Sequence, residues 1–398
     1  MLGKITRVRR FALFLASLFA ALFFCASASV ESGAQTVYHI TNPYANVDWA
    51  SYGQYKANLH THSRISDGDH STSTMVEAYY AKGYDILAMT DHSYLTPDWD
   101  LVRSGAVSPE RKNEIQAGAD RGGRSMTGIE NTNEQSSVNH INTFWAPFNN
   151  VPHATMSAII GKAEELGGIS HINHPGRYTG GSKQKDTASI AASNKPGMIQ
   201  KYVDLFMQYP SCVGLEIVNR LDNHSKADRI LWDNILKETM PAGRFVWGFA
   251  NDDAHRLTDI GYSWNVLLMP SNHQAEIRKA METGAFYAVS RVSRLDNINR
   301  RKPNGSEMPG YGASATQYLL EQPTPGIVDI SVNGDTIIIH GVDYDRIEWI
   351  ADGVVIATGN GIVLSDHAGR ITSYIRAQLM SETGIAFTQP FGVSAAGE

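Results

Sequence analysis

Short apolar runs that end in histidine or a carboxylate recur along the chain, and this pattern constrains the fold more than any other feature. Residues 55–59 lead into His60-Thr61-His62, and residues 86–90 lead into Asp91-His92. Between them, Thr74-x-x-Glu77 has the spacing of a capping box and predicts a helix. A strand, a helix and a second strand within about thirty-five residues are typical of a βαβ unit with parallel strands.

The alternation of short apolar runs and helical segments continues downstream. Helices are predicted at 155–166, 198–209 and 225–239, and strands at 125–129, 139–145, 168–173, 213–218 and 245–250. Polar residues gather at the C-terminal ends of these strands, which is where the active face of a β/α barrel lies. The sequence therefore predicts an α/β fold, an irregular (β/α)7 barrel over residues 35–299.

The N-terminal residues have the features of an export signal. Four basic residues precede an apolar run at 11–24, and Ala26-Ser27-Ala28 supplies the small residues that a signal peptidase requires. The run is shorter than the ~20 residues that span a bilayer, so no stable membrane anchor is expected. We expect residues 1–28 to be a signal peptide and the protein to be periplasmic or extracellular. Arg9-Arg10 leaves the choice between the general and the twin-arginine export routes open.

Net charge and cysteine content narrow the class of protein further. Cleavage after Ala28 removes four basic residues and no acidic ones, which takes the net charge from −6 to −10. Nucleic-acid partners are not expected, because affinity for them comes from basic surfaces. Cys212 is then the only cysteine, so no intrachain disulfide stabilises the exported protein.

The last quarter of the chain differs in character. Residues 300–326 contain four prolines and are predicted to be a linker. Residues 327–398 hold short β-rich runs separated by Asn333-Gly334, Asp352-Gly353 and Gly359-Asn360-Gly361, which predicts a small antiparallel, β-sandwich-like domain. Because no cluster of potential metal ligands occurs there, we expect this C-terminal domain to be dispensable for chemistry.

Potential metal ligands lie at the predicted strand ends. A zinc ion takes three or four protein ligands, so a larger set implies several ions. Imidazoles with carboxylates suit zinc, manganese or iron better than magnesium or calcium. The sequence thus predicts two or three divalent ions, and the candidate ligands are His60, His62, Asp67, His92, Glu130, His140, His174, Asp253 and His255.

The ordered set resembles the polymerase and histidinol phosphatase (PHP) family over roughly residues 55–289. The resemblance rests on His60-x-His62 with Ser66-Asp67-Gly68, Thr90-Asp91-His92, Glu130, His174-Pro175 and Asp253-x-His255. It implies an irregular seven-stranded barrel that holds up to three metal ions, with Glu130 bridging two of them. His171 is an alternative to His174, and Asp252 is an alternative to Asp253.

The resemblance also implies a hydrolytic phosphoesterase, in which the metal ions activate water for attack on phosphorus. Arg177 and Arg256, which follow His174-Pro175-Gly176 and His255, are placed by sequence to bind a phosphate through two parallel hydrogen bonds. The expected catalytic residues are Glu130, Asp253, Arg177 and Arg256. Glu216 either orients a ligand imidazole or forms an ion pair at the edge of the core.

Two other classes of function stay open at this point. The same activated water attacks carbonyl carbon, so a metallohydrolase of amide, ester or acetyl groups is one alternative. A binding module that carries metal without catalysis is the other. The expected partner is a small or oligomeric phosphate ester, and the sequence indicates neither the identity of that ester nor the oligomeric state.

Overall fold

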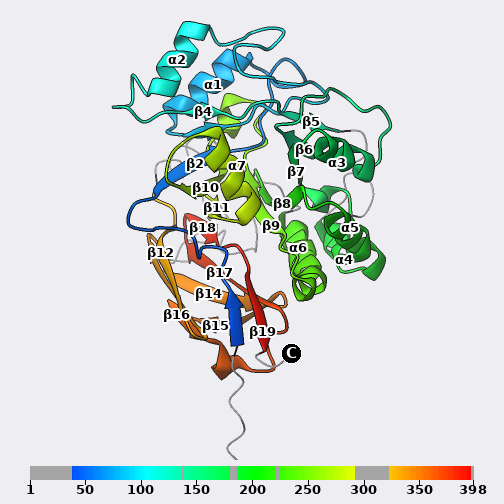
Figure 1. Ribbon diagram of the computed structural model, residues 1–398, viewed down its shortest axis with the longest axis vertical. Coiled ribbons are helices and arrows are strands. Elements are labelled where there is room, and N and C mark those ends of the chain that lie inside the picture. Colours follow the sequence, from blue (N-terminus) through cyan, green and yellow to red (C-terminus); the bar gives the residue numbers. More distant parts are fainter. Residues whose placement is uncertain (1–37, 137–138, 180–185, 221–224, 292–321, 396–398) are drawn as a thin grey trace, which may run out of the picture. The chain divides into compact units, whose positions relative to one another are not determined.

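The computed structural model describes residues 38–136, 139–179, 186–220, 225–291 and 322–395 (Figure 1). The predicted signal peptide 1–28 and most of the predicted linker 300–326 lie outside the described residues. Within the described ranges, no helix combines the length and the hydropathy needed to cross a membrane. The described residues belong to one compact unit.

Two sheets carry the strands of the predicted barrel. In the first, β2 (Gly53–Asn58), β3 (Ile86–Leu87) and β4 (Thr127–Gly128) are parallel, and β10 (Ser263–Met269) pairs antiparallel with β2 and with β11 (Phe286–Ser290). The second sheet has the order β5 (Asn133–Gln135), β6 (Ile141–Phe144), β7 (Ile169–Ile172), β8 (Cys212–Asn219) and β9 (Trp247–Asn251). Its last three strands are parallel.

Seven helices accompany these strands in the described residues (Figure 1). The core on the outer side of β8 is formed by apolar side chains of α5 and α6, among them Phe206 and Trp232. The helix predicted from the capping box begins two residues earlier than Thr74, because Oγ of Ser71 accepts a hydrogen bond from the Thr74 amide. The helices are α1 (Thr72–Ala81), α2 (Pro109–Ala117), α3 (Met156–Glu165), α4 (Asp186–Ser193), α5 (Pro196–Gln208), α6 (Ser225–Thr239) and α7 (Gln274–Thr283).

The two sheets do not close into the predicted barrel by continuous strand pairing among the described residues. On one side, β3 and β4 are only two residues long, and isolated bridges between His92 and Glu134 and between Thr96 and Thr132 join the chain beyond β3 to β5 and the residue before it. On the other side, the side chain of Asn265 in β10 forms two hydrogen bonds with the main chain of Ala250 in β9. Its Oδ1 accepts from the Ala250 amide at 3.0 Å, and its Nδ2 donates to the Ala250 oxygen at 2.8 Å. A side-chain amide thus replaces a ladder between these strands, and the fold is a mixed α/β arrangement of sheets.

The C-terminal residues form antiparallel strands, as the turn signals predict. Asp352 and Gly353 both have positive φ, 53° and 78°, which is the backbone of a type I′ hairpin turn. Three of the strands form a separate sheet: β12 (Gly326–Asn333), β13 (Thr336–Val342) and β16 (Gly361–Val363). The others are β14 (Arg346–Ala351), β15 (Val354–Thr358), β17 (Tyr374–Ser381), β18 (Gly384–Phe387) and β19 (Phe391–Ala395).

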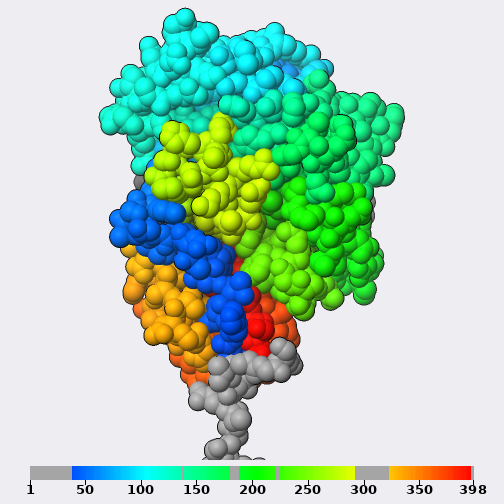
Figure 2. Space-filling view, in the orientation of Figure 1, coloured from blue at the N-terminus to red at the C-terminus, as the bar shows by residue number. Residues whose placement is uncertain are grey.

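Strand pairing joins this C-terminal segment to the rest of the compact unit, where the sequence predicts a domain of its own. β18 pairs with β11 through Ala288 opposite Phe387 and Val289 opposite Ala386. At the other end of the chain, β1 (Tyr38–Thr41) pairs with β19, and Figure 2 shows the N-terminal residues in blue against the red C-terminal strand. The C-terminal strands therefore extend the first sheet and bury its β11 edge.

A buried ion pair makes a second connection, between α6 and β17. Nε and Nη2 of Arg376 each lie 2.7 Å from one carboxylate oxygen of Asp233, and the Tyr374 hydroxyl donates to the same carboxylate at 2.9 Å. Both charged side chains are at least nine-tenths buried. Removing one partner of such a pair leaves an uncompensated buried charge, which typically costs about 3–5 kcal/mol.

Candidate metal centre

The two histidines of His60-x-His62 follow directly after β2. Thr61 between them forms a parallel bridge with Ala254, and its amide donates to Oγ1 of Thr90 at 3.0 Å, so the chain stays extended beyond the strand. Alternation along an extended chain sends both rings to one side, where their centroids lie 5.1 Å apart. Both histidines are fully buried.

Glu134 of β5 lies at the centre of the cluster. Its Oε1 is 3.1 Å from Nε2 of His60 and 2.9 Å from Nδ1 of His140. Its Oε2 is 2.5 Å from Nδ1 of His92 and 3.6 Å from Nε2 of His62. The two oxygens of this fully buried carboxylate thus face different histidines, as a carboxylate that bridges two ions requires.

Glu130, to which the sequence assigns the bridging position, lies elsewhere. Its residue is exposed, its main-chain oxygen accepts from the Trp145 amide at 3.1 Å, and it belongs to none of the possible metal-binding groups in the described residues. The chain leaves β4 at Gly128 and turns through Asn131, which has a φ of 53°. It re-enters at β5, and Glu134 there occupies the position expected for Glu130.

A more open group lies on the other side of His62. Oδ1 of Asp67 is 3.3 Å from Nε2 of His255, and Oδ2 is 3.5 Å from Nε2 of His92. The Asp67 side chain is 55% exposed, while those of His92 and His255 are about one-fifth exposed. Oδ1 of Asp253, in contrast, lies deep in the cluster, 3.1 Å from Nε2 of His62.

Eight of the nine candidate ligands are brought together, all except Glu130. In each group, one donor atom per residue lies within 4.8 Å of the others. The groups share members, so neighbouring ions would share ligands. The groups are His62, Asp67, His92 and His255; His60, Glu134 and His174; His60, His62 and Asp253; and His92, Glu134 and His140.

The two alternative ligands occupy structural positions. The His171 ring packs between Phe144 and Phe249, with centroids 5.2 and 4.8 Å away, and burial lowers its pKa to about 3. Asp252 accepts hydrogen bonds from the main-chain amides of residues 261–263 at 2.8–3.0 Å and from the Tyr84 hydroxyl at 2.9 Å. Neither residue belongs to a possible metal-binding group within the described ranges.

Polar residues behind the cluster hold the ligands in position. Oε1 of Glu216 lies 2.8 Å from Nδ1 of His60, and Oε2 accepts from the His174 amide at 2.9 Å. Asn173 donates to Oε1 of Glu134 at 2.6 Å. Asp91 accepts from both the amide and the hydroxyl of Ser63, at 2.7 and 2.8 Å, which fixes the start of the loop that carries Asp67. These contacts restrict ring and carboxylate orientation before any ion binds.

The candidate ligands differ in their protonation states. Burial would lower the pKa of His60, but the carboxylates of Asp253, Glu216 and Glu134 outweigh burial and raise this pKa well above its usual range, so a metal ion must displace a proton from this ring. Burial would raise the pKa of Glu134, but the neighbouring His140, His60 and His92 outweigh burial and lower this pKa well below its usual range. Burial lowers the pKa of His62 to about 4 and also lowers that of His174. The carboxylate is therefore ionised, and these two imidazoles are neutral, near neutral pH. A ligand imidazole must be neutral to coordinate a metal.

Several buried atoms of the cluster lie close to one another but form no well-aligned hydrogen bond within the described residues. Such atoms are rare in folded proteins, and a group of them facing one another indicates a missing partner. All are nitrogen or oxygen donors of the kind that zinc, manganese or iron accepts, so the residues fit divalent metal ions. The atoms are Nε2 of His60, both ring nitrogens of His62 and of His174, Nδ1 of His92 and Oε2 of Glu134.

The arginines near the cluster only partly match the expectation. Nη2 of Arg177 is 3.6 Å from Oδ2 of Asp253 and 2.9 Å from Oδ1 of Asn219, so Arg177 lies beside the ligands. Arg256 is 62% exposed and pairs with Asp259 at 3.3 Å, outside the possible metal-binding groups. Arg220 donates from Nε to the main-chain oxygen of Asp253 at 2.5 Å and contacts the His255 ring, and no sequence motif marks this arginine.

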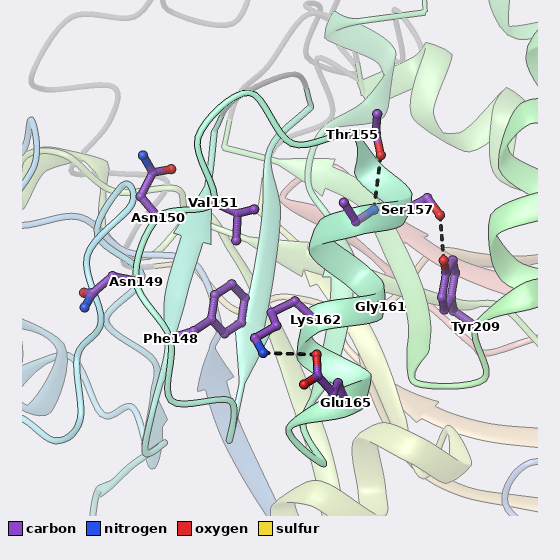
Figure 3. A pocket seen from close by; sticks show the side chains of 11 residues that line it. Phe148, Asn149, Asn150, Val151, Thr155, Ser157, Gly161, Lys162, Glu165 and Tyr209 are labelled. Atoms are coloured by element: carbon purple, nitrogen blue, oxygen red, sulfur yellow. Dashed lines mark hydrogen bonds and ion pairs between the residues drawn. The ribbon is translucent and has the colours of Figure 1, made fainter.

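A hollow of about 650 Å³ lies over α3, and Figure 3 shows the side chains that line it. Lys162 and Glu165 pair across its wall at 3.0 Å, and the Ser157 and Tyr209 hydroxyls lie 2.6 Å apart. It shares no residue with the four groups and contains no histidine. The candidate chemistry therefore belongs to the cluster and not to this hollow.

Comparison with known proteins gives limited similarities. No family profile matches the chain. A segment of 48 residues, 12% of this chain, is 46% identical to the DNA polymerase/3'-5' exonuclease PolX of Bacillus subtilis strain 168 and spans 8% of that protein.

Among solved structures, a two-domain protein from Bacteroides vulgatus that contains a predicted PHP-like metal-dependent phosphoesterase is 14% identical. It has a TM-score of 0.42, with 88% of this chain and 89% of that one covered. The lesion-specific endonuclease PfuEndoQ of Pyrococcus furiosus is 16% identical, with a TM-score of 0.35 and coverage of 58% and 56%. An amidohydrolase from Chromobacterium violaceum is also 16% identical, with a TM-score of 0.33 and coverage of 50% and 87%. TM-scores below 0.5 do not establish a shared fold.

Proposed function

We propose that this chain is an exported, metal-dependent phosphoesterase of the PHP type that hydrolyses a small or oligomeric phosphate ester. The observation that carries the proposal is the position of Glu134, whose two oxygens face separate histidines inside a buried cluster of nitrogen and oxygen atoms that lack well-aligned hydrogen bonds. Bound divalent ions would activate water and neutralise charge on the phosphate oxygens. The local identity to a protein named as a 3'-5' exonuclease supports hydrolysis of phosphate esters.

Side chains around the cluster would hold the metal ligands in position and bind the phosphate. Glu216 and Asn173 hold His60 and Glu134 in position, and Asp253 separates the buried histidines from the arginines. Arg177 is placed to donate to a phosphate oxygen, because its guanidinium lies beside the cluster and is about one-quarter exposed. A neutral acyl substrate gains less from such a cation before charge develops.

The experiment uses three substrates that release the same chromophore: p-nitrophenyl phosphate, bis(p-nitrophenyl) phosphate and p-nitrophenyl acetate. Metal-reconstituted protein should hydrolyse at least one phosphate, and Arg177→Ala should weaken that activity by about 2–4 kcal/mol in transition-state stabilisation. Arg256→Ala is the matched control and should behave as the wild type. Cleavage of the acetate alone, with no effect of Arg177→Ala, would select the acyl-hydrolase alternative.

Export is the second component of the proposal. It is supported by the basic residues, the apolar run and the Ala26-Ser27-Ala28 site of the N-terminal sequence. The mass of protein recovered from a secreting host should equal that of residues 29–398. Recovery of the uncleaved chain from the cytoplasm alone would remove export from the proposal.

A further inference from the structure

Arg177 and Tyr178, three and four residues after His174, both lie beside the metal cluster, one with a cationic side chain and the other with an aromatic one. The turn η1 (Pro175–Arg177) is held by hydrogen bonds from the Arg177 amide to the His174 oxygen at 3.1 Å and from the Tyr178 amide to the Pro175 oxygen at 2.9 Å. Asp228 accepts from the Gly176 amide and ties the same turn to α6. Arg177 and Tyr178 therefore leave a fixed backbone and not a free loop.

Arg177 brings its cation to the carboxylate of Asp253, and Tyr178 brings an aromatic ring to the histidines. The Tyr178 ring lies 5.4 Å from the His140 ring at 30° and 5.7 Å from the His174 ring at 40°. Tyr178 is only partly buried, whereas His174 beneath it is fully buried. The tyrosine thus covers two candidate ligands and still presents surface beside the cluster.

A guanidinium and an aromatic ring on one rigid turn are complementary to a ligand that joins an anion to a flat ring. The guanidinium donates charge-assisted hydrogen bonds to phosphate oxygens. An aromatic ring close to the phosphate can stack on, or meet edge-on, the tyrosine ring. A saturated group of the same size gains only from burial.

We propose that Tyr178 determines specificity by selecting phosphate esters whose ester group carries an aromatic ring, such as aryl, arylmethyl or nucleoside phosphates. This inference rests on the proposed phosphoesterase function and names the substrate class of the same site. The competing role for Tyr178 is packing alone, in which the ring supports His140 and His174 and touches no substrate.

The test compares benzylphosphonate with cyclohexylmethylphosphonate, which have similar size and charge and lack a hydrolysable ester bond. Binding of each to the zinc-reconstituted full chain is measured by calorimetry. The wild type should bind the benzyl compound about 2- to 12-fold more tightly, the range that an aromatic pair typically adds beyond burial. Tyr178→Phe should keep this preference, and Tyr178→Leu should lose it while metal content, measured by elemental analysis, stays unchanged.

The outcomes separate the two proposals. Equal binding of the two phosphonates by the wild type overturns this inference even if phosphate esters are hydrolysed. A Tyr178→Leu variant that loses metal, or that weakens both ligands equally, assigns the tyrosine to packing and also overturns it. A metal-reconstituted wild type that hydrolyses none of p-nitrophenyl phosphate, bis(p-nitrophenyl) phosphate and benzyl phosphate overturns the phosphoesterase proposal, and the present one with it.

Discussion

Oε1 of Glu216 lies 2.8 Å from Nδ1 of His60, and this contact leaves Nε2 of the same ring facing Glu134 and Asp253. With one hydrogen on Nδ1 held by this carboxylate, Nε2 is the ring atom from which a metal ion would displace a proton. Glu216 also accepts hydrogen bonds from the side-chain Nδ2 atoms of Asn219 and Asn251 at 2.9 and 2.8 Å. In each of these contacts the buried Glu216 carboxylate accepts a hydrogen bond. A glutamine side chain in its place would turn its NH₂ group toward one of these donors.

Glu216→Gln is therefore expected to weaken metal binding by about 10- to 100-fold, the usual effect of losing a group that orients a ligand. Glu165→Gln is a suitable control, since Glu165 is 67% exposed on α3. The measurement is a competition titration against a chromogenic chelator. Equal affinity in the two variants would show that Glu216 serves only the core.

The identity of the bridging carboxylate gives the next prediction. Glu134→Gln should lose metal and phosphoesterase activity together, because an amide cannot present two anionic oxygens to two cations. Glu130→Gln changes the same chemical group on an exposed residue and should retain both properties. Elemental analysis and the chromogenic assay are run on both variants. Loss of activity in Glu130→Gln, with Glu134→Gln unaffected, would reverse the assignment.

The difference between Glu130 and Glu134 shows what the sequence can predict. The strand ends at His60, His92 and Asp253 follow apolar runs, and hydrophobic periodicity detects such runs. β5 consists of Asn133, Glu134 and Gln135, all buried, and contains no apolar residue. A strand that is buried because it lines a polar site has no hydrophobic signature, so the ligand was placed on the preceding apolar run.

The predicted role of Arg256 and the predicted closed barrel are not supported by the structure for a related reason, which is that both depend on contacts between residues distant in sequence. The position of Arg256 directly after His255 predicts a phosphate contact, but proximity in sequence does not determine side-chain direction, and the Arg256 side chain pairs with Asp259. Arg220 reaches Asp253 from the end of another strand. Among the helices, α3, α5 and α6 lie within two residues of their predicted ends, whereas α2, α4 and α7 are not predicted. Pairing between sheets depends on contacts distant in sequence, such as β11 with β18, and no local pattern encodes them.

The exposure of Asp67 predicts that the ions are not equally retained. Asp67 is 55% exposed, while His60, Glu134 and His174 are almost completely buried. A dilute chelator should therefore remove one equivalent of metal quickly and the remainder slowly. Asp67→Asn should lack the fast phase and keep the slow one. A single phase in the wild type would contradict this unequal retention.

The last prediction concerns the C-terminal strands, which the sequence analysis expects to be dispensable for chemistry. A chain that ends near Gly310 lacks β18, which pairs with β11, and Arg376, which neutralises the buried carboxylate of Asp233. We expect this truncated chain not to fold, so that its loss of activity accompanies a loss of secondary structure measured by circular dichroism.

Point variants test the ion pair between Arg376 and Asp233 separately. Arg376→Met should destabilise the protein by about 3–5 kcal/mol in urea unfolding, because Asp233 keeps its buried charge without a cation to balance it. Arg376→Met combined with Asp233→Leu should recover much of that loss, since apolar residues of similar volume can replace a buried pair. A truncated chain that is folded, metallated and active would show that the β11 edge and Asp233 tolerate exposure, and would restore the expectation of an independent C-terminal domain.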